Sequence, residues 1–276
     1  MPTKKVNITD QLIVGGDSPF LLIAGPCVIE TEEHTLRLAA SIKAVADELS
    51  IPFVFKASFD KANRTSLASY RGPGLEEGLR ILARVKKEHH VPLLSDVSEP
   101  GQMERAAEVL DIIQIPAFLC RQTDLILAVA RSGKVVNVKK GQFLAPWEVE
   151  HIIKKVTSTG NKRVMITERG TTFGYNNLVV DMKSFPILKG FGYPVIFDVT
   201  HSLQLPGGSG DSSGGEAEFI EPLARAGIAI GIDGLFMEVH DDPTEALSDG
   251  TNSLKLELLP PLLASLKQID NLAKGF

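Results

Sequence analysis

Eight short apolar runs rich in Val, Ile and Phe recur along the chain, and segments with helical periodicity separate most of them. The runs cover residues 20–27, 51–59, 91–97, 112–118, 135–141, 163–169, 195–202 and 234–240. Their apolar character is nearly continuous, which is typical of strands that are buried on both faces of a parallel sheet. Eight such strands predict an α/β protein with a closed (β/α)8 TIM barrel.

The segments between the runs carry helix signals. Apolar residues spaced by three or four positions over 36–49 and 75–85 predict two helices, and Glu32 and Glu33 suit the first turn of the first one. Pro146 stands where a helix over 147–156 would begin. Because strand, loop and helix alternate without a shift in composition, we expect one barrel domain over residues 1–276.

Two segments depart from this alternation. Residues 5–14 predict a small β-hairpin within an N-terminal extension over 1–19, placed to close the bottom of the barrel. Residues 204–215 contain five glycines and three serines, which predict a mobile loop after the seventh strand. Because that strand end is polar, a lid over a site is favoured over a solvated linker.

Composition narrows the classes of function. The chain has 29 basic and 34 acidic residues, a net charge of −5, which argues against a protein that binds nucleic acids or membrane surfaces. Cys27 and Cys120 are too few for a disulfide scaffold. The first residues lack the apolar segment of a secretory signal, so we expect a cytoplasmic protein.

The predicted strand ends are strongly polar. In a barrel of this kind, reactive side chains gather at the C-terminal ends of the strands. The polar residues at or just beyond these ends are Cys27, Lys56, Lys61, Asp96, Gln114, Lys139, Gln142, Glu168, Arg169, His201, Gln204, Glu238 and His240. We therefore expect the functional site at this rim.

One subset of these residues has the chemistry of metal ligands. Cys27, His201 and Glu238, with Asp249 from the following loop, offer a thiolate, an imidazole and carboxylates to Fe²⁺, Mn²⁺ or Zn²⁺. Each residue alone also has an ordinary interpretation, as a buried thiol or a hydrogen-bonded side chain. Their spacing does not resemble a zinc finger, so both interpretations stay open at this point.

A second subset is cationic. Its members are Lys56, Lys61, Arg64, Arg121, Lys139 and Arg169. Six cations converging on one rim would repel one another unless anions bind there, and guanidinium groups match phosphate oxygens. The pattern predicts small substrates that carry phosphate and also carboxylate groups.

Several runs resemble one enzyme family. They read IAGPCVIE (23–30), FKASFDKANRTS (55–66), QIPAFLCRQTD (114–124), TERG (167–170), FDVTHS (197–202), FMEVH (236–240) and DNLAKGF (270–276). Together they resemble 3-deoxy-D-manno-octulosonate 8-phosphate synthases over nearly the whole chain. The resemblance implies a transferase of lipopolysaccharide inner-core biosynthesis. Such an enzyme condenses phosphoenolpyruvate, D-arabinose 5-phosphate and water to the eight-carbon sugar acid phosphate and inorganic phosphate.

The resemblance also implies roles for individual residues. Phosphoenolpyruvate would be held by Lys61, Gln114, Lys139, Gln142, Arg169 and Gln204. The sugar phosphate would be held by Asn63, Arg64 and Thr65, assisted by Arg121 from a neighbouring subunit of a homotetramer. Lys56, Asp96, Ala117 and Phe118 complete the expected substrate-binding set.

The motif around Cys27 carries a further implication. Family members with cysteine at this position depend on a metal, whereas members with asparagine do not. The resemblance thus assigns Cys27, His201, Glu238 and Asp249 as ligands, and Cys27, Lys61, His201 and Asp249 as the catalytic set. The choice among zinc, iron and manganese stays open, as does the choice between polarising the aldehyde and positioning the water.

Two other functions are considered. The related synthase that uses erythrose 4-phosphate shares the Gly-Pro-Cys motif, but its second-strand motif typically reads Lys-Pro-Arg-Thr-Ser. Here residues 62–66 read ANRTS, which favours the five-carbon sugar. A catalytically silent barrel that binds phosphorylated metabolites would have lost some strand-end groups, and no matched position is lost.

Overall fold

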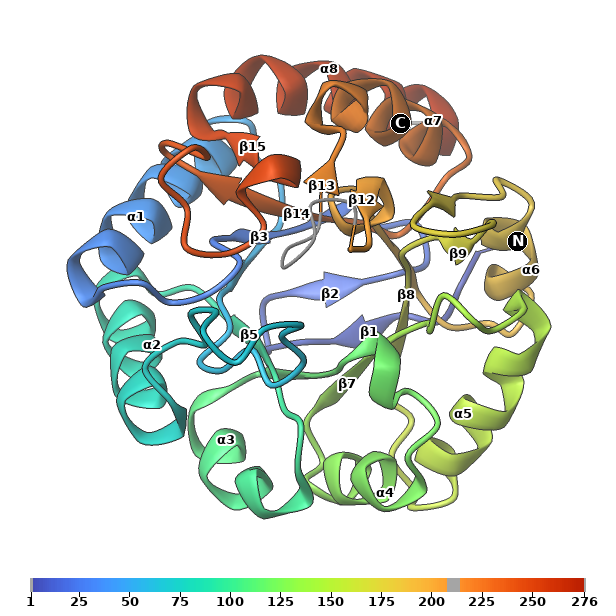
Figure 1. The fold of residues 1–276 in the computed structure, drawn as a ribbon. Coiled ribbons are helices and arrows are strands. Elements are labelled where there is room, and N and C mark those ends of the chain that lie inside the picture. Colours follow the sequence, from blue (N-terminus) through green and yellow to red (C-terminus); the bar gives the residue numbers. More distant parts are fainter. Residues whose placement is uncertain (1, 208–213, 276) are drawn as a thin grey trace.

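The computed structural model describes residues 2–207 and 214–275. Within them, eight parallel strands pair in sequence order, and the last returns to the first, which closes the barrel (Figure 1). The barrel strands are β3 (Leu21–Gly25), β4 (Phe53–Lys56), β5 (Leu93–Asp96), β6 (Ile112–Ile115), β7 (Val135–Lys139), β8 (Val164–Glu168), β11 (Val195–Asp198) and β14 (Gly234–His240). The predicted TIM barrel is confirmed.

A ring of helices surrounds the strands (Figure 1). In the described part of the chain these are α1 (Glu32–Glu48), α2 (Leu75–His89), α3 (Met103–Val109), α4 (Thr123–Arg131), α5 (Val149–Thr157), α6 (Ser184–Lys189), α7 (Ile220–Ala229) and α8 (Leu259–Lys274). The helix predicted over 147–156 begins instead with a 3₁₀ turn at Pro146–Glu148. Glu148 N–H donates to Ala145 O at 3.1 Å, so the tight turn precedes the α-helix. None of the helices described is long and apolar enough to span a bilayer.

The predicted N-terminal hairpin is present as β1 (Val6–Asn7) and β2 (Ile13–Val14). Its apolar side chains belong to one buried cluster with inward-facing residues from all eight barrel strands. The hairpin members are Val6, Ile8 and Val14, and all are at most 3% exposed. The hairpin therefore closes the interior of the barrel at the end where the strands begin.

The barrel interior changes from apolar to polar along the strands. Side chains two residues apart share one face of a strand, so Ile112 is followed inward by Gln114, and Phe236 by Glu238. The polar layer consists of Lys56, Asp96, Gln114, Asn137, Thr167, Asp198 and Glu238, all buried. The regular pleat of the sheet thus places ionisable groups just above an apolar floor.

Short two-stranded ladders form in the loops at the polar, C-terminal end of the barrel. β9 (Thr171–Thr172) pairs with β10 (Leu178–Val179), and β12 (Gln204–Leu205) pairs with β13 (Gly214–Gly215). β15 (Leu254–Lys255) pairs with the end of β14. The ends of the predicted loop 204–215 are thus an antiparallel ladder. Its centre, residues 208–213, lies outside the described residues, and the lid stays a prediction.

Candidate active site and metal centre

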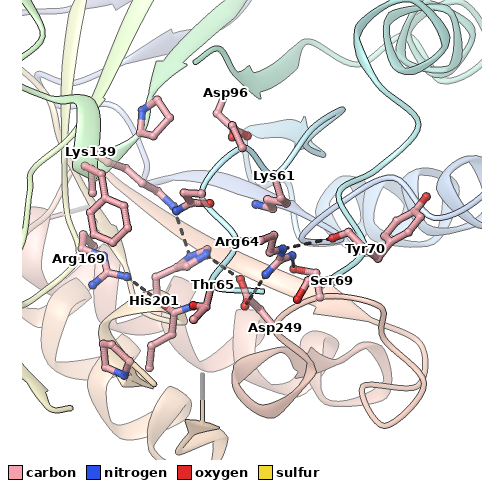
Figure 2. Close-up of a pocket in the computed structure, with 18 of the residues that line it drawn as sticks. Lys61, Arg64, Thr65, Ser69, Tyr70, Asp96, Lys139, Arg169, His201 and Asp249 are labelled. Carbon is pink, nitrogen blue, oxygen red and sulfur yellow. Dashed lines mark hydrogen bonds and ion pairs between the residues drawn. The ribbon is translucent and has the colours of Figure 1, made fainter. Parts of the chain in front are cut away.

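A cavity of about 910 Å³ opens at the C-terminal ends of the barrel strands (Figure 2). Most of the residues predicted for the site line it. They are Lys61, Asn63, Arg64, Thr65, Asp96, Gln114, Ala117, Phe118, Lys139, Gln142, Arg169, His201, Gln204 and Asp249. Cavities of several hundred cubic ångströms hold small ligands, so this one has room for two phosphorylated metabolites.

Four predicted site residues are not among those lining the cavity. Cys27, Lys56 and Glu238 lie at its base and are at most 4% exposed. Arg121 is exposed, and its carbonyl oxygen accepts a hydrogen bond from Lys155 Nζ at 3.0 Å. The structure therefore brings together every predicted cation except Arg121, with Lys56 beneath the others.

The predicted metal ligands converge at the base of the cavity. Donor atoms of Cys27, His201 and Glu238 lie within 4.8 Å of one another. Asp249 Oδ2 lies 3.1 Å from Cys27 Sγ and 3.6 Å from His201 Nε2. Ligand atoms around a tetrahedral ion are about 3.3–3.7 Å apart, since metal–ligand bonds measure roughly 2.0–2.3 Å. The set fits a divalent metal ion.

One observation supports this fit independently of distance. Glu238 is fully buried, and its Oε2 has no hydrogen-bond partner among the described residues. An uncompensated buried carboxylate oxygen is costly, and a bound cation would satisfy it. The other oxygen, Oε1, accepts from Lys56 Nζ at 2.8 Å.

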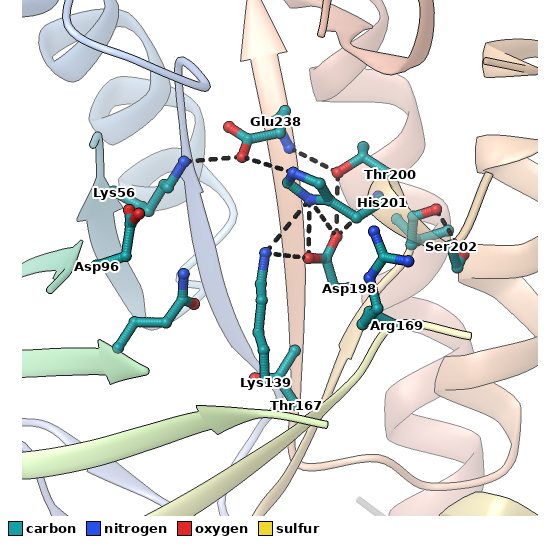
Figure 3. Close-up of polar contacts among 12 residues, drawn as sticks. Lys56, Asp96, Lys139, Thr167, Arg169, Asp198, Thr200, His201, Ser202 and Glu238 are labelled. Carbon is teal, nitrogen blue, oxygen red and sulfur yellow. Dashed lines mark hydrogen bonds and ion pairs between the residues drawn. The ribbon is translucent and has the colours of Figure 1, made fainter. Parts of the chain in front are cut away.

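Asp198 orients His201 (Figure 3). Its Oδ2 lies 2.9 Å from His201 Nδ1, and its Oδ1 accepts from the His201 backbone N–H at 3.0 Å. These contacts leave Nε2 directed at Glu238, 3.6 Å from Oε1. A carboxylate behind a ligating histidine sets the ring orientation and makes the ligand more basic.

Sequence reasoning did not include Asp198 in the site. The available signal was the Asp-x-x-His spacing at a strand end, which places the carboxylate against the backbone and ring of His201. It also missed Ser248, whose Oγ lies 2.9 Å from Cys27 Sγ. Asn137 was missed as well, and its side chain bridges Gln114 and Thr167 at 3.0 and 2.7 Å.

Lys56 differs from its expected substrate-binding position. Its Nζ donates to Glu238 Oε1 and to Cys27 O, both at 2.8 Å. The ammonium therefore bridges two predicted ligand residues from below the cavity. It compensates negative charge in the donor set, and it holds β4 against the chain that follows β3.

The three cations that face the cavity are compensated to different degrees. Arg169 Nη2 donates to Gln204 Oε1 at 2.7 Å, while Nη1 is buried without a hydrogen-bond partner in the described residues. Burial lowers the pKa of Arg169 and that of Lys139, although Asp198 opposes both shifts. For Lys61, burial is outweighed by nearby acidic groups, Cys27 and Asp96 first, which raise its pKa. A bound anion would pair with Arg169 Nη1 and would oppose the effect of burial on Arg169 and Lys139.

Arg64 is paired within the protein. Its Nη1 lies 3.6 Å from Asp249 Oδ1, its Nη2 donates to Ser248 Oγ, and its Nε donates to Tyr70 O at 3.3 Å (Figure 2). Asp249 itself has a left-handed backbone with a φ of 51°. For Arg64 to bind a phosphate group, it would exchange these partners for the substrate.

The protonation of His201 gives a testable expectation for metal binding. Burial opposes a charge on His201, but Asp198 outweighs it, and the pKa rises to about 9. The ring is therefore mostly protonated at neutral pH, and Cys27 Sγ donates a hydrogen bond to Asp249. Ligation needs neutral imidazole and thiolate, so metal affinity should rise with pH up to about 9.

We expect binding at this site to release roughly two protons per ion near pH 7.5. Calorimetric titration of the metal-free protein in buffers of different ionisation enthalpy measures this number. A Cys27→Ala variant lacks one of the two groups that release a proton, so any metal binding that remains there should release fewer protons. Proton-independent binding by the native protein would contradict the protonation assigned to His201.

Comparison with known proteins identifies the family. Residues 3–274 match the DAHP synthetase I family. A 2-dehydro-3-deoxyphosphooctonate aldolase of Geotalea uraniireducens is 63% identical over 261 residues, 95% of this chain and 96% of the relative. Those of Geotalea daltonii and Geobacter sulfurreducens are 62% and 60% identical over 98% and 99% of this chain, and 99% and 100% of theirs. The resemblance inferred from the motifs is confirmed, and the chain belongs to the DAHP synthetase I family, among the 2-dehydro-3-deoxyphosphooctonate aldolases.

Proposed function

We propose that this protein condenses phosphoenolpyruvate with D-arabinose 5-phosphate and water, giving 3-deoxy-D-manno-octulosonate 8-phosphate and inorganic phosphate. The observation that carries the proposal is the cavity in which Lys61, Lys139 and Arg169 meet directly above Cys27 and Glu238. Cations for two anionic substrates and a donor set for a divalent metal are thus combined in one site. The names of the relatives agree with this substrate class.

The reaction joins a nucleophilic carbon of phosphoenolpyruvate to an electrophilic carbon of the sugar. Carbon three of phosphoenolpyruvate attacks the aldehyde carbon of the sugar, and the aldehyde oxygen takes up a proton. Positive charge develops at carbon two, where water adds and loses a proton, and the resulting hemiketal phosphate expels inorganic phosphate. Because the charge develops between a carboxylate and a phosphate, holding both anions in place supplies proximity and electrostatic preorganisation.

Residues of this chain have distinct tasks in that scheme. Lys61, Lys139 and Arg169, with the amides of Gln114, Gln142 and Gln204, hold phosphoenolpyruvate. Arg169 Nη1 and the buried Gln142 Oε1 have no hydrogen-bond partner among the residues described, which supports this assignment. Asn63, Arg64 and Thr65 hold the sugar phosphate at the other side of the cavity, where the charge-assisted contacts of a guanidinium suit a phosphate group.

Cys27, His201, Glu238 and Asp249 would hold a divalent ion of zinc, iron or manganese. When bound, such an ion supplies Lewis-acid polarisation and orientation at the base of the cavity. Asp198 holds the His201 ring, and Lys56 holds the Glu238 carboxylate. The mixture of thiolate, imidazole and carboxylate suits all three ions.

Release of inorganic phosphate from phosphoenolpyruvate tests the function directly. We expect release only when D-arabinose 5-phosphate is present, with equal amounts of phosphate and sugar acid. Faster release with erythrose 4-phosphate would favour the related synthase instead. Binding of both substrates without phosphate release would favour a metabolite-binding barrel.

Replacing Arg64 should affect the use of one substrate and not the other. Loss of a charge-assisted phosphate contact costs about 1.5–3 kcal/mol, so Arg64→Ala should weaken use of arabinose 5-phosphate by at least ~10-fold. The KM for phosphoenolpyruvate should change little. Arg71→Ala is the matched control, because Arg71 lies nearby in sequence but pairs with Asp60 at the surface. Equal loss for both substrates would contradict the assignment.

We also propose a cytoplasmic homotetramer, each chain a single barrel domain, with Arg121 contributed to a neighbouring site. The exposure of Arg121 supports this. Large apolar side chains are exposed on the segments that follow β6, β7 and β8, namely Phe118, Phe143, Trp147, Phe173 and Tyr175. Analytical ultracentrifugation should give four chains per particle, and Arg121→Ala should impair use of the sugar phosphate without changing that number.

A further inference from the structure

A buried ion pair lies behind the wall of the cavity, at the ends of β7 and β8. Lys140 directly follows β7 and is 1% exposed, and Glu168 ends β8 and is 2% exposed. Lys140 Nζ lies 3.4 Å from Glu168 Oε1. Neither residue is among the described residues that line the cavity. Taking two charges out of water is costly and often adds no net stability, so a role other than stability has to be considered for this pair.

The pleat of the sheet places each member of the pair next to a cation of the cavity. On β8, Ile166 belongs to the apolar cluster that the strands share with the surrounding helices. Glu168 is two residues further and shares that face, because side chains alternate along a strand. The next residue, Arg169, lines the cavity. On the neighbouring strand β7, Lys139 lines the cavity and Lys140 follows it. Each charge of the pair is therefore adjacent in the chain to a cation assigned to phosphoenolpyruvate.

The Lys140 ammonium group joins two loops. Its Nζ donates to Gly141 O at 3.3 Å and to Leu144 O at 3.1 Å, both in the loop after β7. It also donates to Thr171 Oγ1 at 3.2 Å, in the loop after β8. Leu144 N–H donates to Gly141 O at 3.0 Å, so a tight turn closes over the ammonium group. Gln142 lies within this turn and lines the cavity.

The Glu168 carboxylate fixes the chain on the other side of the pair. Its Oε1 accepts the backbone N–H groups of Arg169 at 2.9 Å and of Gly170 at 2.8 Å. Gly170 has a φ of 89°, a conformation that glycine adopts without strain. The chain therefore turns directly after Arg169, around the same oxygen that faces Lys140.

The two loops also contact each other, and both present polar atoms that lack a partner. Thr172 N–H donates to Gln142 O at 3.0 Å. Gln142 Oε1 and Arg169 Nη1 are buried and have no hydrogen-bond partner among the described residues. Such atoms are uncommon in folded proteins, and a bound ligand would explain them. They belong to the residues whose backbones the ion pair holds in place.

We propose that the Lys140–Glu168 ion pair is a positioning element for phosphoenolpyruvate. It holds the turn of Gln142 and the backbone of Arg169 without touching the substrate. This inference rests on the proposed function, because it concerns the residues assigned to that substrate. Groups that are held in place before binding lose less conformational freedom when the substrate arrives, so the affinity depends on the pair. The sugar phosphate is assigned to residues 63–65, which follow β4, so its binding should change little.

Binding of phosphoenolpyruvate tests the proposal separately from turnover. In Lys140→Met, an apolar side chain of similar length replaces the ammonium group, so the turn of Gln142 loses its donor. Calorimetric titration of the full chain should show the Kd for phosphoenolpyruvate raised roughly 10-fold, the effect of misplacing a charge-assisted contact. In the assay of sugar-dependent phosphate release, the KM for phosphoenolpyruvate should rise by a similar factor. The kcat and the KM for arabinose 5-phosphate should change much less.

A double variant distinguishes positioning from stability. Lys140→Met leaves the Glu168 carboxylate buried without its counter-ion, so the protein should lose stability. Lys140→Met/Glu168→Gln has no charge left at the pair and should unfold closer to the native temperature, and it provides the test if the single variant fails to fold. Because the turn of Gln142 still lacks its donor, the Kd for phosphoenolpyruvate should stay raised. Recovery of native affinity together with stability would show a purely structural role and overturn the proposal.

Lys86→Met is the matched control. Lys86 Nζ also donates to a backbone oxygen and a carboxylate, Val109 O at 3.0 Å and Asp111 Oδ1 at 2.7 Å. This pair lies at the opposite end of the barrel, where Asp111 Oδ2 accepts the Leu93 N–H at the start of β5, so the control should keep the native Kd and KM for phosphoenolpyruvate. A native protein that binds no phosphoenolpyruvate would overturn the proposed function as well. Native Kd and KM values in the folded Lys140 variants would overturn only the positioning role.

Discussion

Replacement of Cys27 by alanine is expected to lower turnover strongly and to remove tight metal binding at the Cys27, His201, Glu238 and Asp249 site. The thiol is 4% exposed, contacts Ser248 and Asp249, and is the one sulfur donor of the cluster among the described residues, so alanine leaves the site without its soft ligand. Lewis-acid and orienting effects of a metal are worth several kcal/mol, which corresponds to a rate loss of roughly 10²–10³-fold. Chelation of the native enzyme should have the same effect and should be reversed by added Zn²⁺, Mn²⁺ or Fe²⁺.

Two variants make this result specific. Cys120→Ala removes the other buried thiol, which is not part of the Cys27, His201 and Glu238 cluster, and should keep both the metal and its thiolate charge-transfer band with Co²⁺. Cys27→Asn should lose tight binding but keep a chelator-resistant fraction of activity, because an amide positions water or sugar hydroxyl groups by hydrogen bonds. Full activity of the native protein after verified metal removal would show that Cys27 is only a packed thiol.

Replacement of Asp198 by asparagine is expected to weaken metal binding by about 10–100-fold, the usual effect of losing a carboxylate behind a ligating histidine. Asp198 is fully buried and contacts both His201 and Lys139. Burial opposes its charge, but His201 and Lys139 outweigh this and lower its pKa far below the usual range. The asparagine variant leaves the Lys139 ammonium buried without its counter-ion, which should cost about 3–5 kcal/mol of unfolding free energy.

A second buried aspartate provides the matched control. Asp233 lies at the opposite end of the barrel, where its carboxylate accepts hydrogen bonds from Thr3 Oγ1 and Val195 N at 2.8 and 2.9 Å. Burial raises its pKa, so a neutral amide there is tolerated more easily. Asp233→Asn should cost at most about 1–3 kcal/mol, the range for one unsatisfied buried group, and leave metal affinity unchanged. Equal losses of cobalt affinity in both variants would assign Asp198 a purely structural role.

Asp198→Asn should also change the KM values of the two substrates to different extents. With saturating metal, its KM for phosphoenolpyruvate should rise because Lys139 loses its anchor, while the KM for arabinose 5-phosphate should stay near the native value. Lys139 Nζ lies 3.3 Å from His201 Nδ1, and the Asp198 carboxylate contacts both groups (Figure 3). A selective change of this kind would not arise from general loss of packing.

Much of the fold could be predicted because its physical signals are local. A strand buried on both faces must be apolar over several residues, and a helix covering it must be apolar at spacings of three and four, so both patterns are present in the sequence itself. The glycine of the motif at 23–27 is also understandable in these terms. A Cβ at Gly25 would lie 1.9 Å from Lys56 O, so only glycine allows β3 to approach β4 there.

A possible metal-ligand group was likewise accessible from the sequence. Cys27, His201 and Glu238 were grouped by chemistry and by position at strand ends, with Asp249 from the following loop, and barrel closure then brings such ends to one rim. Strand boundaries were less accessible, because the run 51–59 forms a strand only over Phe53–Lys56. Beyond Lys56 the chain leaves the sheet to carry polar groups into the cavity. Apolar content alone does not predict where the strand ends.

Only the tertiary structure decided how each charged group is compensated. Lys56 and Glu238 are 182 positions apart, yet they form a buried ion pair, which places Lys56 under the predicted metal ligands rather than in the cavity. Asp198 stands behind His201 because the chain turns directly after β11, and no periodicity in the sequence distinguishes it from other buried aspartates. The sequence determines which chemical groups reach the polar end of the barrel, since strand register is set by local apolar patterns. Their pairing depends on distances between strands far apart in sequence, and these distances exist only once the barrel has closed.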